Sequence, residues 1–191
     1  MIILKGRRIW LGEIKKEDIP ILCEWRNDAR FMSHCSTRRN NVLLRDFEKE
    51  IEFDFGRDRY LQCMIFKREK PVGTIYSYNL NRTDGYVFVT IYIVGDYEKR
   101  GYGVEAFALF LFHLFQTIQL YKVYVEVYSY NQHSLDCLKK AGFIEEGRFK
   151  GHRFYQNQRH DLIRFAFFRK DLLNLKKFIN DLTKRSFMQV L

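Results

Sequence analysis

The second half of the chain alternates between segments typical of strands and segments typical of helices. Residues 86–94 are rich in β-branched and aromatic side chains, and residues 122–127 are typical of a second, short strand. Between them, residues 101–118 form a long apolar helix pattern, and residues 131–141 form another that ends at Gly142. This order, placed after strands that look antiparallel, predicts an α/β domain with a mixed central sheet and flanking helices.

The N-terminal part supplies a strand and a helix. Alternation over residues 7–14 predicts the strand, with Ile9 and Leu11 on its buried side. A helix is expected to open near Glu17, where acids and a proline suit a first turn, and to end at Asn27.

A second amphipathic helix is predicted over residues 43–55. Its apolar face is made of Leu43, Leu44, Phe47, Ile51 and Phe55. Four further strands are predicted at residues 60–67, 71–78, 143–150 and 162–168, with a polar loop over residues 156–160. These elements form one domain over residues 1–170. Residues 171–191 follow as a tail, with a basic helix over about 171–185, packed on the domain or extending from it.

Composition excludes several other classes of protein. The chain has 191 residues, of which 47% are hydrophobic, so one domain with a sizeable core is expected. The net charge is +10, but the absence of a long Lys/Arg run and of RNP or zinc-finger patterns argues against nucleic acid as a partner. No apolar run reaches the roughly 20 residues of a membrane span, and the N-terminus does not resemble a signal peptide. We therefore expect a cytoplasmic protein with no membrane partner.

The cysteine pattern gives no sign of a metal or redox site. No Cys-x-x-Cys pair occurs. Free thiols are expected at Cys23, Cys35, Cys63 and Cys137.

A glycine-containing loop joins the strand over residues 86–94 to the following helix. It reads Glu98-Lys99-Arg100-Gly101-Tyr102-Gly103. Free amides and the dipole at a helix N-terminus attract anions, and glycines let a phosphate approach the main chain closely. The spacing fits neither a Walker A loop nor a dinucleotide fingerprint. Taken alone, the loop is either a phosphate site of another kind or an ordinary helix start.

A second motif follows about 30 residues later. Asn131-Gln132-His133-Ser134 opens a helix that ends at Leu138-Lys139-Lys140-Ala141-Gly142-Phe143, and Glu145-Glu146-Gly147-Arg148 follows. Together with the glycine loop, these residues resemble the GNAT family of acyl-CoA-dependent N-acetyltransferases. They look most like its RimJ/RimL branch, which acetylates N-terminal amines of ribosomal proteins. The segment over residues 147–151 also resembles acetyltransferases of nucleotide-linked amino sugars.

The resemblance implies a site for acetyl-CoA. In the family, two neighbouring parallel strands splay apart and the thioester lies in the gap. Here those strands are residues 86–94 and 122–127. Main-chain groups near Ile93 and Val94 are then expected to pair with the pantetheine arm, and Asn131 to hydrogen-bond it. The pyrophosphate is expected on the amides of Lys99, Arg100, Gly101, Tyr102, Gly103 and Val104.

The implied chemistry is direct attack of a neutral amine on the thioester, which needs an acid near the departing sulfur and a route for the amine's proton. Many relatives have a tyrosine acid where this chain has Leu138, so Ser134 is the expected acid; its other role is to support the helix start. The base is unassigned, because His152 and Arg153 stand where the branch has a glutamate. Glu126 is either a paired structural acid or a base that acts through water.

Two further expectations concern the substrates. Glu98 replaces the Gln or Arg that usually begins the family motif, so its carboxylate is expected to point away from the pyrophosphate or to pair with Lys99 or Arg100. The acceptor-binding residues are expected among Arg26, Asp28, His152 and Tyr155.

We therefore predict an acetyl-CoA-dependent N-acetyltransferase that acts on a primary amine, uses no metal and is a monomer or a homodimer. A protein or peptide amine is placed slightly ahead of a nucleotide-linked amino sugar, whose diphosphate the basic residues between 148 and 170 would attract. A non-catalytic CoA-binding module is the alternative from a different class.

Overall fold

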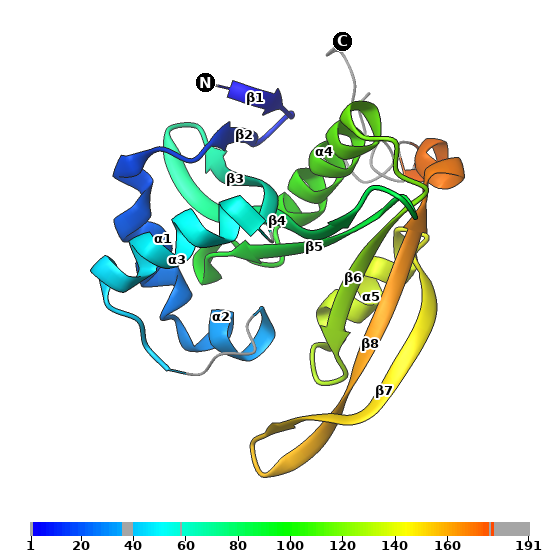
Figure 1. Cartoon of the computed structure of the whole chain (residues 1–191). Coiled ribbons are helices and arrows are strands. Elements are labelled where there is room, and N and C mark those ends of the chain that lie inside the picture. The colour runs from blue at the N-terminus through cyan, green and yellow to red at the C-terminus, as the bar shows by residue number, and fades with distance from the viewer. Residues whose placement is uncertain (1, 36–39, 58, 176, 178–191) are drawn as a thin grey trace.

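The computed structural model describes residues 2–35, 40–57, 59–175 and 177, and within them eight strands form one sheet (Figure 1). The strands are β1 (Ile2–Lys5), β2 (Trp10–Glu13), β3 (Arg59–Lys67), β4 (Lys70–Asn81), β5 (Tyr86–Ile93), β6 (Lys122–Tyr128), β7 (Ile144–Tyr155) and β8 (Gln158–Phe168). The helices are α1 (Ile19–Arg26), α2 (Ala29–His34), α3 (Leu44–Arg57), α4 (Tyr102–Thr117) and α5 (Gln132–Lys140). In the sheet the strands lie in the order β1-β2-β3-β4-β5-β6-β8-β7.

The sheet is antiparallel except at its centre. β5 and β6 run parallel, whereas the other neighbouring strands pair antiparallel. Parallel neighbours need a long crossover, and α4 supplies it between these two strands. The predicted fold class, an α/β domain with a mixed sheet, is confirmed. None of the described helices is long and apolar enough to cross a membrane.

Two hydrophobic clusters lie on opposite faces of the sheet. On one face α4 is buried, and Phe110 and Leu114 have no exposed surface. On the other face α1, α2 and α3 pack together with Met64 of β3. The neighbours of Met64 along β3, Cys63 and Ile65, belong to the α4 cluster, as the alternation of side chains along a strand requires. Figure 1 shows α1–α3 beside the β2–β5 half of the sheet, while the β7–β8 hairpin extends away from them.

The N-terminal strand predicted over residues 7–14 is shorter and is preceded by another. β1 and β2 form a hairpin whose turn begins at Gly6, and the Gly6 amide donates to the Ile9 carbonyl (2.9 Å). Ile9 and Leu11 are buried, as predicted. A side chain at Gly6 would begin 2.6 Å from Glu105 Oε1, so the turn packs closely on α4. Local alternation does not report this contact, which is why the turn was missed.

The final hairpin is longer than the sequence predicts. β7 and β8 pair as far as Tyr155 and Gln158, so most of the polar loop predicted over residues 156–160 is strand. The turn consists of Gln156 and Asn157, both with positive φ, as a two-residue hairpin turn of the I′ type requires. The first residues of β8, Gln158, Arg159 and His160, are all polar, so no apolar alternation marks them as strand.

Two expectations for the helices are partly wrong. In α3, Phe47 and Ile51 are buried as predicted, but Leu43 and Leu44 are 63% and 42% exposed. The helix begins at Leu44, so Leu43 lies outside its periodic face. The Phe55 side chain and most of the tail helix predicted over 171–185 lie outside the described residues. The short helix α2 was not predicted, because Asp28 looked like the end of a helix and is instead the N-cap of the next.

Candidate functional site

The parallel pair at the centre of the sheet separates soon after it forms. The paired residues are Tyr86 with Lys122, Val87 with Val123, and Phe88 with Tyr124. Beyond them β5 stays paired with β4 as far as Ile93, and β6 stays paired with β8 as far as Tyr128. Each strand therefore leaves the other while keeping its outer neighbour. This is the splayed arrangement that the sequence resemblance implies.

Main-chain groups of β5 face the separation at alternate residues. The Val94 amide donates to the Val72 carbonyl of β4 (2.9 Å), and the Val94 carbonyl accepts from the Tyr97 amide (2.8 Å), so both main-chain groups of Val94 already have partners. The Ile91 carbonyl points the other way, where it accepts from Cys35 Sγ (3.5 Å). The main-chain amide and carbonyl of successive strand residues point to opposite sides. Ile93 therefore presents its amide and carbonyl to the same side as Ile91, two residues before it.

The loop that precedes α4 carries a run of unbonded amides. Those from Lys99 to Val104 have no hydrogen-bond acceptor among the residues that the structure describes. Lys99 and Gly101 both have left-handed backbone conformations, with φ of 57° and 79°. Such alternation curls the chain so that successive amides converge on one anion. The six residues predicted to bind a pyrophosphate thus form one surface at the N-terminus of α4.

The two loop glycines, predicted to give a phosphate clearance, have different surroundings in the structure. Gly101 has a positive φ, and a Cβ there would lie 3.0 Å from Arg8 Nη2. A Cβ on Gly103 would lie 3.4 Å from Ile93 Cγ1 and would therefore face β5. Gly101 thus permits the turn and the contact with Arg8, whereas a Cβ on Gly103 would make only ordinary van der Waals contact with β5.

Glu98 is paired with a residue that the sequence did not indicate. Its carboxylate lies 3.4 Å from Arg30 Nη1 of α2, so pairing with Lys99 or Arg100 was the wrong expectation. The Arg30 guanidinium lies against Gly95, where a Cβ would overlap it. Arg30 therefore neutralises the one carboxylate of the loop and connects α2 to it.

A second helix begins at the same edge of the sheet, because β5 and β6 are parallel and α5 follows β6. Asn131 is the N-cap of α5, and its Oδ1 accepts from the Ser134 amide (3.3 Å). This cap leaves the Asn131 Nδ2 group without a hydrogen-bond partner among the described residues. The two residues predicted near the thioester are thus neighbours in one helical turn.

The four residues predicted to bind the acceptor have different surroundings. Arg26 is buried at the end of α1. Asp28 caps α2, accepting from the amides of Arg30 (2.8 Å) and Phe31 (3.3 Å). His152 is exposed on β7, and Tyr155 packs against the Tyr130 ring at 4.8 Å. Asp28 therefore acts as a helix cap, and Tyr155 joins an aromatic cluster beside α2.

Two residues that the sequence did not place near α2 hold its far end. Tyr130 donates from its hydroxyl to the Ser33 carbonyl, and Arg153 Nη2 donates to the Met32 carbonyl (2.9 Å). Burial raises the pKa of Tyr130 to about 12, so its hydroxyl stays protonated and able to donate. Because Arg30 connects the other end to Glu98, α2 is bonded to both sides of the separated strands. These contacts join distant segments, so no local motif marks them.

The sheet face near the separation carries an acid that is already paired. Glu126 Oε1 accepts from Arg164 Nε (3.0 Å) and Nη2 (2.7 Å). The Arg164 guanidinium lies 5.0 Å from the Phe88 ring and 5.4 Å from the Tyr124 ring. Burial, with a smaller contribution from the nearby Glu126 charge, raises the pKa of Tyr78 to about 12. Glu126 is thus paired with Arg164, as the first of the two alternatives for this residue requires.

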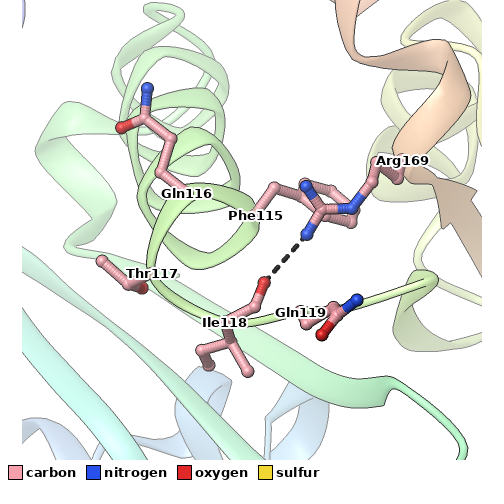
Figure 2. A pocket seen from close by; sticks show the side chains of 6 residues that line it. All are labelled: Phe115, Gln116, Thr117, Ile118, Gln119 and Arg169. Carbon is pink, nitrogen blue, oxygen red and sulfur yellow. Dashed lines mark hydrogen bonds between the residues drawn. The ribbon is translucent and has the colours of Figure 1, made fainter.

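A hollow of about 360 Å³ lies at the opposite end of α4 (Figure 2). Its lining consists of Phe115, Gln116, Thr117, Ile118, Gln119 and Arg169. Arg169 donates to the carbonyls of Ile118 (2.8 Å) and Leu120 (2.7 Å), which lie just beyond the helix. This hollow is therefore separate from the glycine loop. Among the described residues, no group of three or more His, Cys, Asp or Glu side chains could hold a metal ion.

We expect Gly101→Ala to weaken CoA binding, because an L-residue at this φ is strained and its Cβ would press on Arg8. A loss of about tenfold in the dissociation constant, measured by calorimetry, is the expected result. Gly147→Ala is the matched control, since a Cβ there meets nothing within 4 Å and φ is not positive. Equal affinity in the two variants would contradict the assignment of the loop.

Comparison with known proteins identifies relatives with a similar sequence or a similar fold. The chain is 24% identical over 167 residues to the SPbeta prophage-derived uncharacterized N-acetyltransferase YokL of Bacillus subtilis (strain 168), covering 87% of this chain and 93% of that protein. The structure of spermidine N-acetyltransferase from Vibrio cholerae with CoA and spermine superposes with a TM-score of 0.80 at 16% identity, covering 87% of this chain and 99% of that one. RimL, the ribosomal L7/L12 α-N-protein acetyltransferase in complex with CoA, gives 0.77 at 14% identity, covering 88% and 98%.

The family itself follows from the sequence. A family profile described as an acetyltransferase (GNAT) domain matches residues 8–144, which is well over half of the chain. The matched residues include the separated strands, the glycine loop and the start of α5. The chain therefore belongs to the GNAT family and is an N-acetyltransferase.

Proposed function

We propose that this protein moves an acetyl group from acetyl-CoA to a primary amine by direct attack of the amine on the thioester. One observation carries the proposal: the unbonded amides from Lys99 to Val104 lie at the sheet edge where β5 and β6 have separated. Such amides suit a diphosphate, and the main-chain groups of Ile93 suit the amides of a pantetheine arm. That the spermidine N-acetyltransferase and RimL structures contain CoA supports this assignment.

Asn131 and Ser134 are the residues that we propose at the sulfur end of the coenzyme. The Asn131 side chain bonds the helix start through Oδ1, which leaves Nδ2 to hold the coenzyme arm. The Ser134 hydroxyl donates a proton to the sulfur as the thiolate leaves. Leu138, where many relatives have a tyrosine, packs against the core and has no proton to give.

If Ser134 is this acid, Ser134→Ala should lower turnover by roughly 10²-fold while the dissociation constant for CoA stays unchanged. His133→Ala, one position earlier on the same helix, is the control and should keep the wild-type rate. Release of CoA thiol measures turnover, and calorimetry measures binding. An unchanged rate in Ser134→Ala would contradict the acid role and would mean that Ser134 only supports the start of the helix.

The charges around the separated strands favour a peptide or protein amine as acceptor. A polyamine acceptor carries several positive charges and would need unpaired carboxylates to bind it. Glu126, however, is paired with Arg164, and Glu98 is paired with Arg30. Three of the basic residues that would attract a nucleotide diphosphate are also engaged: Arg148 pairs with Glu145 and Asp161, while Arg153 and Arg169 bind main-chain carbonyls. A peptide α-amine needs neither kind of free charge, so we place it ahead of a nucleotide-linked amino sugar.

Thiol release from acetyl-CoA tests the activity and the acceptor together. We expect the highest kcat/KM with peptides that have a free α-amine, and lower values with a polyamine or a nucleoside-diphosphate amino sugar. The same peptides with a blocked N-terminus serve as controls. Thiol release with none of these amines, in a protein that binds CoA, would favour the non-catalytic module.

The proton of the acceptor is expected to leave without one dedicated base. A peptide α-amine has a pKa near 7.7–8.0, so about a tenth or more is neutral at pH 7. Only the neutral amine attacks, so the rate should rise with pH up to this pKa and then level off. No single substitution among Glu126→Gln, His152→Ala and Tyr155→Phe should abolish turnover.

A pH–rate profile of these three variants checks this. A drop of more than roughly 10³-fold in one variant, with CoA binding intact, would identify that residue as the base.

A further inference from the structure

The side chain of Arg8 lies against the glycine loop with all three types of guanidinium nitrogen engaged. Nη1 donates to the Arg100 carbonyl (2.9 Å), and Nη2 donates to the Gly101 carbonyl (3.0 Å). Nε donates to Glu105 Oε2 (2.8 Å), and the guanidinium lies 5.1 Å from the centre of the Tyr102 ring. Arg8 belongs to the turn between β1 and β2, so the N-terminal hairpin contacts the loop directly.

Glu105 holds this turn in place. Its side chain carries a carboxylate, yet it is only 1% exposed, because it lies on the buried, apolar helix α4. Its Oε1 accepts from the amides of Arg7 (2.7 Å) and Arg8 (2.8 Å), while Oε2 accepts from the Arg8 side chain. Gly6 leaves room for this, since a Cβ there would lie 2.6 Å from Oε1. A buried carboxylate is costly without such partners, so Glu105 and the turn depend on each other.

The geometry of the peptide bond converts these contacts into an orientation. In a planar trans peptide, the carbonyl of one residue and the amide of the next point in opposite directions. Arg8 holds the carbonyls of Arg100 and Gly101 on its own side. The amides of Gly101 and Tyr102 belong to the same two peptides, so they point away from Arg8 and toward the anion site.

We propose that Arg8 is a positioning residue for the coenzyme, which turns the Gly101 and Tyr102 amides toward the diphosphate, and that Glu105 fixes Arg8 in this role. The proposal rests on the proposed use of acetyl-CoA. Arg8 acts by shape more than by charge, because the Glu105 carboxylate balances its charge at 2.8 Å. A lysine would keep the charge but would lack the planar fork that reaches two carbonyls and a carboxylate together.

Arg8→Lys and Arg8→Met separate geometry from charge, and Arg45→Met is the matched control. Arg45 lies on α3, where it pairs with Asp46. Calorimetry with CoA should give a dissociation constant raised by about tenfold or more in both Arg8 variants, and a value within about twofold of wild type in the control. Wild-type affinity in Arg8→Lys would overturn the proposal, because charge alone would then suffice.

Amide spectra of ¹⁵N-labelled protein distinguish positioning from general damage. In the wild type, CoA should shift the amide signals of Gly101, Tyr102 and Asn131. In the Arg8 variants the shifts at Gly101 and Tyr102 should be lost, while the shift at Asn131 persists at saturating CoA. Loss of all three shifts together with a lowered melting temperature, or retention of all three, would overturn the role. If wild-type protein bound no CoA, the proposed function would fail first, and this outcome is distinct from the others.

Discussion

Main-chain hydrogen bonding at the centre of the sheet governs the rest of this structure. A strand inside a sheet normally bonds on both sides, and leaving one side unbonded is costly where water is excluded. β5 and β6 are not bonded to each other over most of their length. Each is held in the sheet by its outer neighbour instead. The Cys35 thiol donates to the Ile91 carbonyl, and the main-chain groups of Ile93 are those that we propose for the pantetheine arm. Burial raises the pKa of Cys35 to about 12, so the thiol stays protonated and can donate.

α4 connects the core with the site. Its apolar surface packs on the sheet through residues such as Phe110, and this packing fixes where its N-terminus lies. The free amides and the partial positive charge of the dipole are therefore placed by core residues far from any ligand. At the other end, Arg169 donates to the carbonyls of Ile118 and Leu120, just beyond the helix (Figure 2).

Features encoded by a local sequence pattern could be predicted. Contacts between segments that are distant in the sequence could not. The apolar run of α4, the glycine loop and the Asn131 cap are each local, and all three were placed correctly. The partner of Glu98 was wrong, because Arg30 comes from a short helix that no periodicity indicated. Glu105 was overlooked, although a charge in so apolar a helix is a signal that could have pointed to it. Arg153 and Tyr130 bind carbonyls of α2, and a carbonyl leaves no mark in a sequence.

The contact between Arg8 and Glu105 joins residues 97 positions apart in the chain. Closing such a long loop costs conformational entropy. Contacts between residues that are close in sequence carry a smaller cost. β5, α4 and β6 are consecutive in the chain, whereas the bonds from Arg8 to the loop before α4 also require the first hairpin to dock. The first hairpin leaves the ribosome early in synthesis, but its contact with α4 can form only after residue 105 has emerged.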